Sequence, residues 1–178
     1  DLGTSASWNA TTALVPKNAG MASARGTDQV GNIILVAWAG ATLPSTAGDS
    51  TLRVLYNNGA TLSAPKVDSP TPKWAQITAL NSGPSAVINA AMVYSHVTRK
   101  FYVFGGYNPT KKTVNNETWE LSLDPTSGDC SAGACNFIWK NLSKEGLSCY
   151  PSCPQARRSH RMAEVNYYNR NPGGIQAS

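Results

Sequence analysis

Short apolar runs separated by turn residues dominate the chain, and the clearest of them follow one another after residue 90. One run covers residues 91–94, a second covers Phe101–Phe104, and a third begins at Thr118. Aromatic and β-branched residues bounded by Gly, Pro and Asn are typical of strands and turns. We therefore predict three consecutive strands in this part of the chain.

The second of these runs ends at two consecutive glycines, Gly105 and Gly106. Because Phe101–Phe104 shows no polar alternation, we predict a strand that is covered on both faces. A double glycine directly after such a strand predicts a backbone that bends sharply or takes positive φ.

The rest of the chain shows the same character. No stretch repeats its apolar residues with helical spacing, and none is long and apolar enough to cross a membrane. Only 14% of residues are charged, which favours short strands and loops over solvated helices, so we predict an all-β chain. The net charge of +5 is scattered, apart from Arg157, Arg158 and Arg161. We therefore do not expect nucleic acid as a partner.

Landmark residues recur in a fixed order at spacings of 65 to 71 residues. Each unit shows a Trp, a Pro, a Met, an apolar strand that ends in Gly, and a strand that begins with Thr. These landmarks are Trp8, Trp74 and Trp139; Met21, Met92 and Met162; Gly40 and Gly106; and Thr51 and Thr118, the last two 67 apart. Such self-similarity indicates a repeat architecture. Chance spacing in an ordinary β-sandwich is the alternative interpretation.

Four strands per unit predict the four-stranded antiparallel blades of a β-propeller. The run Pro154–Met162, which contains Arg157 and His160, resembles the opening strand of the kelch repeat. The strand that ends in Gly105 and Gly106, the segment from Asn116 to Trp119, and the closing Trp139 resemble the rest of that repeat. The central propeller of galactose oxidase-like proteins is similar.

The resemblance is close over residues 84–168 and weak over residues 16–79. In the weaker unit, Ala39 stands in place of the first glycine and Leu52 in place of the third-strand Trp. In the following unit, Val87 and Ala90 replace the Arg and His of the opening strand.

We expect residues 1–178 to form one partial kelch-type propeller. It would comprise a closing strand at 8–14, full blades at 20–79 and 90–143, and an opening strand at 159–168. The resemblance implies a ring of six or seven blades, and isolated repeats leave apolar faces uncovered. We therefore expect a piece of a longer chain. The alternative is that further copies or partner chains complete the ring.

Four cysteines, Cys130, Cys135, Cys149 and Cys153, flank the strand that holds Trp139. That strand would span about 20 Å at about 3.3 Å per residue, too far for a disulfide to join its two ends. The local pairs 130–135 and 149–153 are therefore favoured. Zinc binding is the competing interpretation, although the two pairs would lie too far apart to share one ion.

Three N-x-Ser/Thr sequons occur, at Asn9, Asn116 and Asn141. With paired cysteines and few charges, they favour a secreted or cell-surface glycoprotein that carries N-linked glycans. Asn116 would precede a partly buried strand, which makes it the least secure acceptor of the three.

The sequence shows little that predicts catalysis, and we assign no catalytic, cofactor-binding or metal-ligating residue. We interpret His160 as a structural side chain bonded to neighbouring backbone, and His96 as a solvated turn residue. No paired His motif, nucleophile elbow or phosphate-binding loop is present.

By analogy with the fold, we expect a protein-interaction or structural scaffold. Its binding surface would come from the insertions 41–50, 57–72, 107–115 and 124–136. One alternative is part of a secreted galactose oxidase-like enzyme whose catalytic residues lie elsewhere. The other is a carbohydrate-binding propeller that stacks sugars on Tyr107, Tyr150, Tyr167 and Tyr168.

Overall fold

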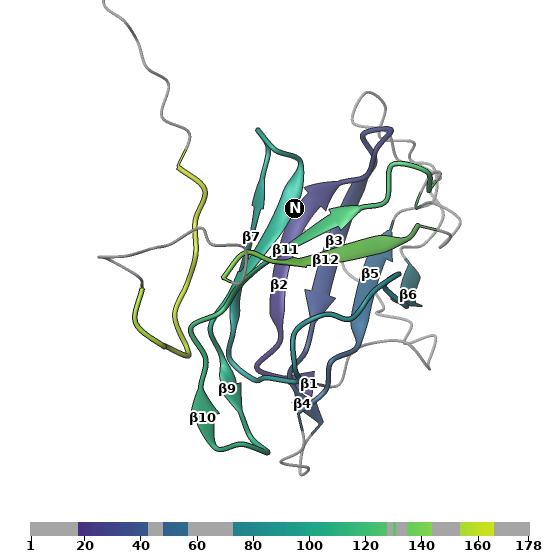
Figure 1. Cartoon of the computed structure of the whole chain (residues 1–178). Coiled ribbons are helices and arrows are strands. Elements are labelled where there is room, and N and C mark those ends of the chain that lie inside the picture. Colours follow the sequence, from purple (N-terminus) through teal and green to yellow (C-terminus); the bar gives the residue numbers. More distant parts are fainter. Residues whose placement is uncertain are drawn as a thin grey trace, which may run out of the picture.

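The computed structural model describes residues 18–42, 48–56, 73–127, 130, 135–143 and 154–165. These residues form strands, turns and extended segments, and no α-helix occurs among them (Figure 1). The part of the chain described here therefore also contains no helix that could span a membrane. The prediction of an all-β chain is confirmed.

Eight of the described strands form two antiparallel sheets of four strands each, as predicted. The first sheet consists of β2 (Ala22–Thr27), β3 (Ile33–Trp38), β5 (Leu52–Tyr56) and β6 (Lys73–Ile77). The second sheet consists of β7 (Ala91–Ser95), β8 (Lys100–Phe104), β11 (Thr118–Leu123) and β12 (Phe137–Asn141). In both sheets each strand pairs with the next of these in chain order, and within the described residues neither sheet closes on itself.

Two small ladders extend these sheets. β1 (Asn18–Ala19) pairs with β4 (Ala41–Thr42), and β9 (Tyr107–Asn108) pairs with β10 (Thr113–Val114). The β9–β10 hairpin projects from the second sheet at the lower end of Figure 1. The insertion predicted at 107–115 is therefore an ordered hairpin.

One row of side chains across each sheet shows that the two sheets are built alike. In the first sheet the hydrogen-bonded ladder aligns Arg25, Leu35, Leu55 and Trp74. In the second sheet it aligns Tyr94, Phe101, Leu121 and Trp139. Trp74 and Trp139 therefore occupy equivalent positions, 65 residues apart, on the last strand of each sheet.

The same ladders correct two details of the sequence alignment. Trp38 pairs with Leu52 and Phe104 pairs with Thr118, so the third strands correspond at an offset of 66 and not 67. Arg53, and not Leu52, thus stands at the position of Trp119. This one-residue error in the alignment matters because neighbouring residues of a strand point to opposite faces of the sheet.

The methionines also fall at different places in the two sheets. Met92 lies on β7. Met21 precedes β2, and the ladders place it at the position of Ala90. The Met spacing, the most irregular of the landmarks, therefore does not mark one structural position.

The sheets pack against each other where β2 lies beside β7. Gly26 makes this close approach possible, because a Cβ atom there would come within 2.6 Å of the Tyr94 ring. The hydroxyls of Thr27 and Tyr94 are 2.8 Å apart across the junction. At the other end of the core, the rings of Trp38 and Trp139 meet edge to face at 5.4 Å. Side chains from both sheets thus form one continuous apolar core.

Strand β8 shows how far this burial extends. Phe101 and Val103 are buried on the face toward the first sheet, and Phe104 is buried on the other face. Tyr102 is only half-buried. The prediction of cover on both faces is therefore correct for the glycine end of the strand and wrong at Tyr102.

Replacing Gly26 with Ala should destabilise the protein by about 1–3 kcal/mol, because the added methyl overpacks the junction against Tyr94 and Phe101. Ser23→Ala is the matched control, since Ser23 is exposed on the same strand. Denaturant unfolding of both variants measures the difference. A Gly26→Ala variant as stable as the parent would contradict the close approach of β2 and β7.

Candidate functional site

Each sheet has a left-handed pair of residues directly after its second strand. The pair Ala39 and Gly40 has φ of 64° and 93°, and the pair Gly105 and Gly106 has φ of 69° and 98°. The prediction of positive φ at the double glycine is confirmed. Ala39 takes the same conformation without being glycine, which explains why the sequence shows only one glycine in the first sheet.

These two turns make the same hydrogen bonds. Gly40 accepts from the backbone N–H of Asp49 at 2.8 Å, and Gly106 accepts from the backbone N–H of Asn115 at 2.8 Å. The Gly40 N–H donates to the Val87 carbonyl at 3.1 Å, and the Gly106 N–H donates to the Arg157 carbonyl at 2.9 Å. Each turn therefore binds the segment of chain that follows its own sheet.

Three further residues with left-handed backbone conformation lie before the first sheet, between the two sheets and after the second sheet. They are Gly20, Asn89 and Ser159, with φ of 69°, 57° and 56°. The Asn89 N–H donates to the Gly20 carbonyl at 2.8 Å, and the Ser159 N–H donates to the Asn89 carbonyl at 2.9 Å. The same contact thus occurs twice, and it joins the segment before the first sheet, the linker between the sheets and the segment after the second sheet.

A similar side-chain hydrogen bond supports each of the two turns. The Asp49 carboxylate accepts from the Thr51 N–H at 2.7 Å, and the Asn115 side-chain oxygen accepts from the Glu117 N–H at 2.9 Å. Burial alone would raise the pKa of Asp49, but hydrogen bonds from Thr51, Arg53 and Asn18 lower it from 3.8 to about 2. Asp49 is therefore ionised at neutral pH.

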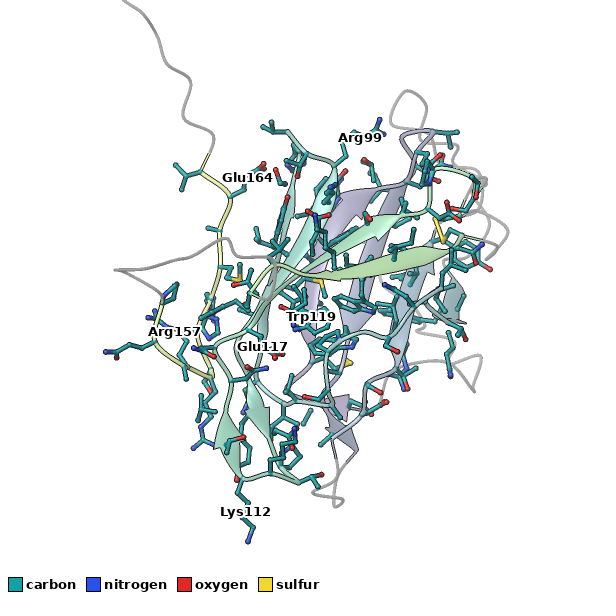
Figure 2. The ribbon with its side chains drawn as sticks, in the orientation of Figure 1. Arg99, Lys112, Glu117, Trp119, Arg157 and Glu164 are labelled. Carbon is teal, nitrogen blue, oxygen red and sulfur yellow. A yellow bond between two sulfur atoms is a disulfide. The ribbon has the colours of Figure 1, made fainter. Side chains whose placement is uncertain are left out.

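Arg157 and His160 come together at Phe104 and Gly105, and Figure 2 labels Arg157 on the segment that follows the second sheet. The guanidinium carbon of Arg157 lies 5.9 Å from the centre of the Phe104 ring, and the His160 ring meets the same ring at 5.4 Å. Met162 follows them and is half-buried. The structure therefore brings Gly105, Gly106, Arg157 and His160 into one contact.

His160 differs from its sequence-based interpretation. Both of its ring nitrogens are buried and have no hydrogen-bond partner among the described residues, so the predicted bond to neighbouring backbone is wrong. The ring instead packs against the Phe104 ring at 76°. Burial, and then the positive charge of Arg157, lower the pKa of His160 from its ordinary 6.5. The buried position of His160 beside Arg157 thus favours its neutral imidazole.

His96 is not simply a solvated turn residue either. The Glu164 carboxylate accepts from the His96 backbone N–H at 2.7 Å and faces its ring Nδ1 at 2.7 Å. The hydrogen bond to the His96 side chain is the main reason that the pKa of Glu164 is lowered. Since the two residues are 68 positions apart, local sequence gave no sign of this contact.

The tryptophans lie in different settings. Trp119 meets Trp139 edge to face at 6.2 Å, and its indole N–H donates to the Glu117 carboxylate at 2.9 Å. Trp74 is half-buried on β6. Trp8 lies outside the described residues, as does the predicted closing strand at 8–14.

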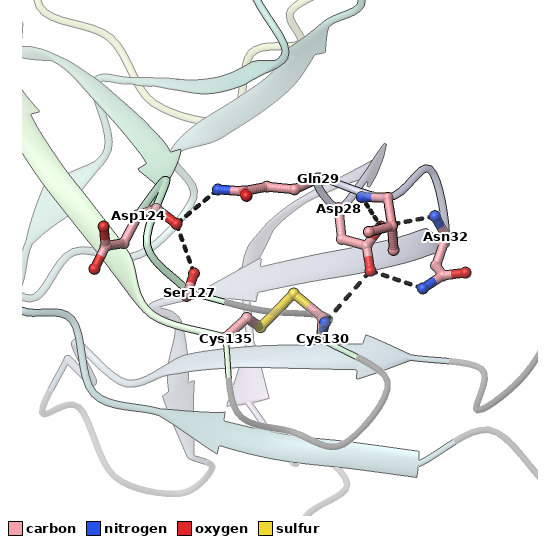
Figure 3. Close-up of a disulfide and its surroundings, with 8 residues drawn as sticks. Asp28, Gln29, Asn32, Asp124, Ser127, Cys130 and Cys135 are labelled. Atoms are coloured by element: carbon pink, nitrogen blue, oxygen red, sulfur yellow. Dashed lines mark hydrogen bonds between the residues drawn. A yellow bond between two sulfur atoms is a disulfide. The ribbon is translucent and has the colours of Figure 1, made fainter.

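Cys130 and Cys135 form a disulfide, one of the two local pairs that the sequence favours (Figure 3). Their Cα atoms are 4.7 Å apart, and both side chains are buried. Cys149 and Cys153 lie outside the described residues.

The sequence analysis missed Asp28, which ties this disulfide to the first sheet. Its carboxylate is 1% exposed and accepts from the backbone N–H groups of Val30, Asn32 and Cys130, the last at 3.4 Å. Gln29 donates to the Asp124 carbonyl at 2.6 Å beside it (Figure 3). An Asp four residues before an Asn, with Gly31 between them, is the turn signal that could have revealed the site.

The two described sequons differ in access. Asn116 is exposed, just before β11. Asn141 is half-buried, and its side-chain nitrogen is buried without a hydrogen-bond partner among the described residues. Asn116 is therefore the more accessible acceptor, contrary to the expectation from sequence. Asn9 lies outside the described residues.

A hollow of about 350 Å³ lies where Trp38 and Trp139 meet the linker between the sheets. Thr51, Gln76 and Asn81 contribute to a lining without ionisable side chains. The described residues contain no group of three or more His, Cys, Asp or Glu side chains that could hold a metal ion. Of the four tyrosines considered for sugar stacking, only Tyr107 lies among the described residues.

A scan of the sequence against models of known protein families and a search of curated proteins found no match.

Replacing Gly105 with Ala should release the segment 154–165. A Cβ atom there would collide with the Arg157 carbonyl and lie 3.0 Å from the His160 ring. Overpacking of about 1.4 kcal/mol would open the segment about tenfold more often, so trypsin should cleave after Arg158 and Arg161 about tenfold faster. Gly31→Ala is the control, because Gly31 also has a positive φ, of 93°, but a Cβ atom there meets nothing within 4 Å. An unchanged cleavage rate in Gly105→Ala would show that the segment does not dock on this turn.

Proposed function

We propose that the two sheets are adjacent blades of an extracellular kelch-type β-propeller that acts as a protein-interaction or structural scaffold. The observation that carries this proposal is the repeated hydrogen bond from each left-handed turn to the segment that follows its sheet, at Gly40 and again at Gly106. A repeat in which every unit binds its neighbour in the same way is expected of a ring or solenoid, and not of an ordinary sandwich.

The faces of the sheets support the same arrangement. In the second sheet, the row that contains Phe101, Leu121 and Trp139 is buried against the first sheet. The equivalent row of the first sheet contains Leu35, Leu55 and Trp74, and the ladder alternation puts it on the face away from the second sheet. These side chains are half-buried. The first sheet could therefore pack on a preceding blade through the same face that the second sheet uses to pack on the first.

The segment after the second sheet supports a further unit. Val87 and Arg157 bind equivalent turns, and Asn89 and Ser159 are equivalent left-handed residues. Since Asn89 corresponds to Ser159, residues 161–165 correspond to the five residues of β7. Residues 161–165 pair with no other strand among the described residues, but their exposure alternates, which is expected of an opening strand that lies against a neighbouring blade on one face.

Details of the kelch resemblance gain support from two contacts. The Trp119 indole bonds to Glu117 within the Asn-Glu-Thr-Trp segment. Arg157 and His160, from the run that begins at Pro154, lie over Gly105 and Phe104. These contacts give structural roles to residues in three of the segments that carry the resemblance.

An extracellular location is supported by the disulfide and by the access of one sequon. Cys130 and Cys135 are paired, and disulfides persist in oxidising compartments. Asn116 is an exposed acceptor on the turn that leads into β11. Both features would serve a stable secreted module.

A scaffold role is supported by the half-buried face of Leu35, Leu55 and Trp74, which is suited to another blade. Such a face assembles with a second copy, with another chain or with further repeats. The β9–β10 hairpin adds an exposed projection, with Lys111 and Lys112 at its tip (Figure 2). The inference from fold to binding is by analogy.

Replacing Leu35 with Glu should weaken self-association of the chain by about tenfold, because a charge would be buried on the face that meets another blade. Sedimentation velocity over a concentration series measures this effect. Thr110→Glu is the control, since it adds the same charge to the exposed hairpin tip. A Leu35→Glu variant that associates like the parent would contradict the proposed blade interface, and a parent chain that stays monomeric at every concentration would exclude a second copy as its occupant.

When the chain is secreted by eukaryotic cells, Asn116 should carry an N-linked glycan because its side chain is exposed. Asn116→Gln should remove one glycan from the intact mass. Asn141→Gln should leave the mass of the glycans almost unchanged, because the side-chain nitrogen of Asn141 is buried. Secreted protein with an unmodified Asn116 would contradict this prediction.

A further inference from the structure

We infer that an exposed basic surface beside the second sheet binds a linear anionic polysaccharide. We call it the basic patch, and it consists of Arg157, Arg158 and Arg161 on the segment 154–165, and Lys111 and Lys112 on the β9–β10 hairpin. All five side chains belong to exposed residues. The propeller proposal uses the backbone of Arg157 and its ring contact but not the charges of these five residues, and this inference does not depend on that proposal.

The two parts of the basic patch are joined by a direct contact. The guanidinium carbon of Arg158 lies 4.9 Å from the centre of the Tyr107 ring, at the base of the hairpin. Lys112 lies at the far tip of the same hairpin, and Figure 2 shows Arg157 at the left edge of the molecule and Lys112 at its lower end. The cations therefore form an extended surface and not a single pocket, which suits a linear ligand.

No carboxylate neutralises these cations within the described residues. The ion pairs found there are Arg53 with Asp49, His96 with Glu164, and Lys100 with Glu120. Glu117, on the turn beside the segment, accepts hydrogen bonds from Trp119 and Asn115. The basic patch thus keeps its charge for an external anion, and concentrated charge of one sign attracts the opposite charge.

The backbone beneath the basic patch is already fixed. The Arg157 N–H donates to the Asn115 carbonyl at 3.2 Å, and the Arg157 carbonyl accepts from Gly106. The Lys111 N–H donates to the Asn108 side chain at 2.9 Å. Binding therefore orders few new backbone torsions, which lowers its entropic cost.

The chemistry of the basic patch favours a polysaccharide over nucleic acid. Single-stranded nucleic acids stack their bases on open aromatic rings. Here Arg158 covers the Tyr107 ring, and Phe104 is buried with His160 against it. What remains open are guanidinium and ammonium groups, which bind sulfate and carboxylate oxygens by charge-assisted hydrogen bonds, often in pairs for Arg.

The test measures binding of the whole chain to immobilised heparin, as a sulfated probe, and to polygalacturonate, as a carboxylated probe, over a salt series. We expect binding to at least one of them, with affinity that falls as salt rises. Tighter binding to heparin would assign sulfate as the preferred group, and tighter binding to polygalacturonate would assign carboxylate. Neutral dextran, polyglutamate and duplex DNA complete the comparison.

The variant Arg158→Gln/Arg161→Gln should lose about tenfold in affinity and lower the salt slope by roughly one for each arginine removed. The matched control is Arg25→Gln/Lys140→Gln, which removes the same charge from exposed residues outside the basic patch. The inference is overturned if neither anionic polysaccharide binds, if the two double variants bind alike, or if dextran, polyglutamate or DNA binds as tightly. Arg157 is left intact because its backbone and ring contacts hold the segment in place.

Discussion

The structure depends on a backbone turned left-handed for two residues at the end of the second strand of each sheet. At Ala39–Gly40 and at Gly105–Gly106, this turn points an N–H group away from its own sheet and toward the segment that comes next. A regular strand could not do so, because its donors lie in the plane of the ladder. The connection between neighbouring units is therefore a backbone interaction, and side chains such as Phe104 and His160 add specificity to it.

Much of the fold could be predicted from sequence because it depends on local signals. Apolar runs and turn residues gave the four-stranded sheets, and the tryptophan spacing of 65 gave the equivalence of Trp74 and Trp139. The register was wrong by one residue at Arg53, since Thr51 and Thr118 are matching letters but not matching positions. Ala39 could not be recognised as left-handed, because that conformation is normally a property of glycine.

Contacts between distant parts of the chain were beyond local reasoning. Glu164 binds His96, and Asp28 accepts from Cys130, across 68 and 102 residues respectively. Access was also misjudged: Asn116 is exposed, whereas the side-chain nitrogen of Asn141 is buried. The depth of a side chain depends on which sheet face it joins, and that follows from tertiary packing.

The buried disulfide has a consequence for the order of maturation. Cys130 is 0% exposed and Cys135 is 2% exposed, so no oxidising enzyme could reach either thiol in the finished protein. The bond therefore forms before Cys130 and Cys135 are buried. Asp28, in a hairpin of the first sheet, accepts from the Cys130 backbone N–H and so links the disulfide to that sheet. Oxidation of these two thiols thus comes before their burial in the folded protein.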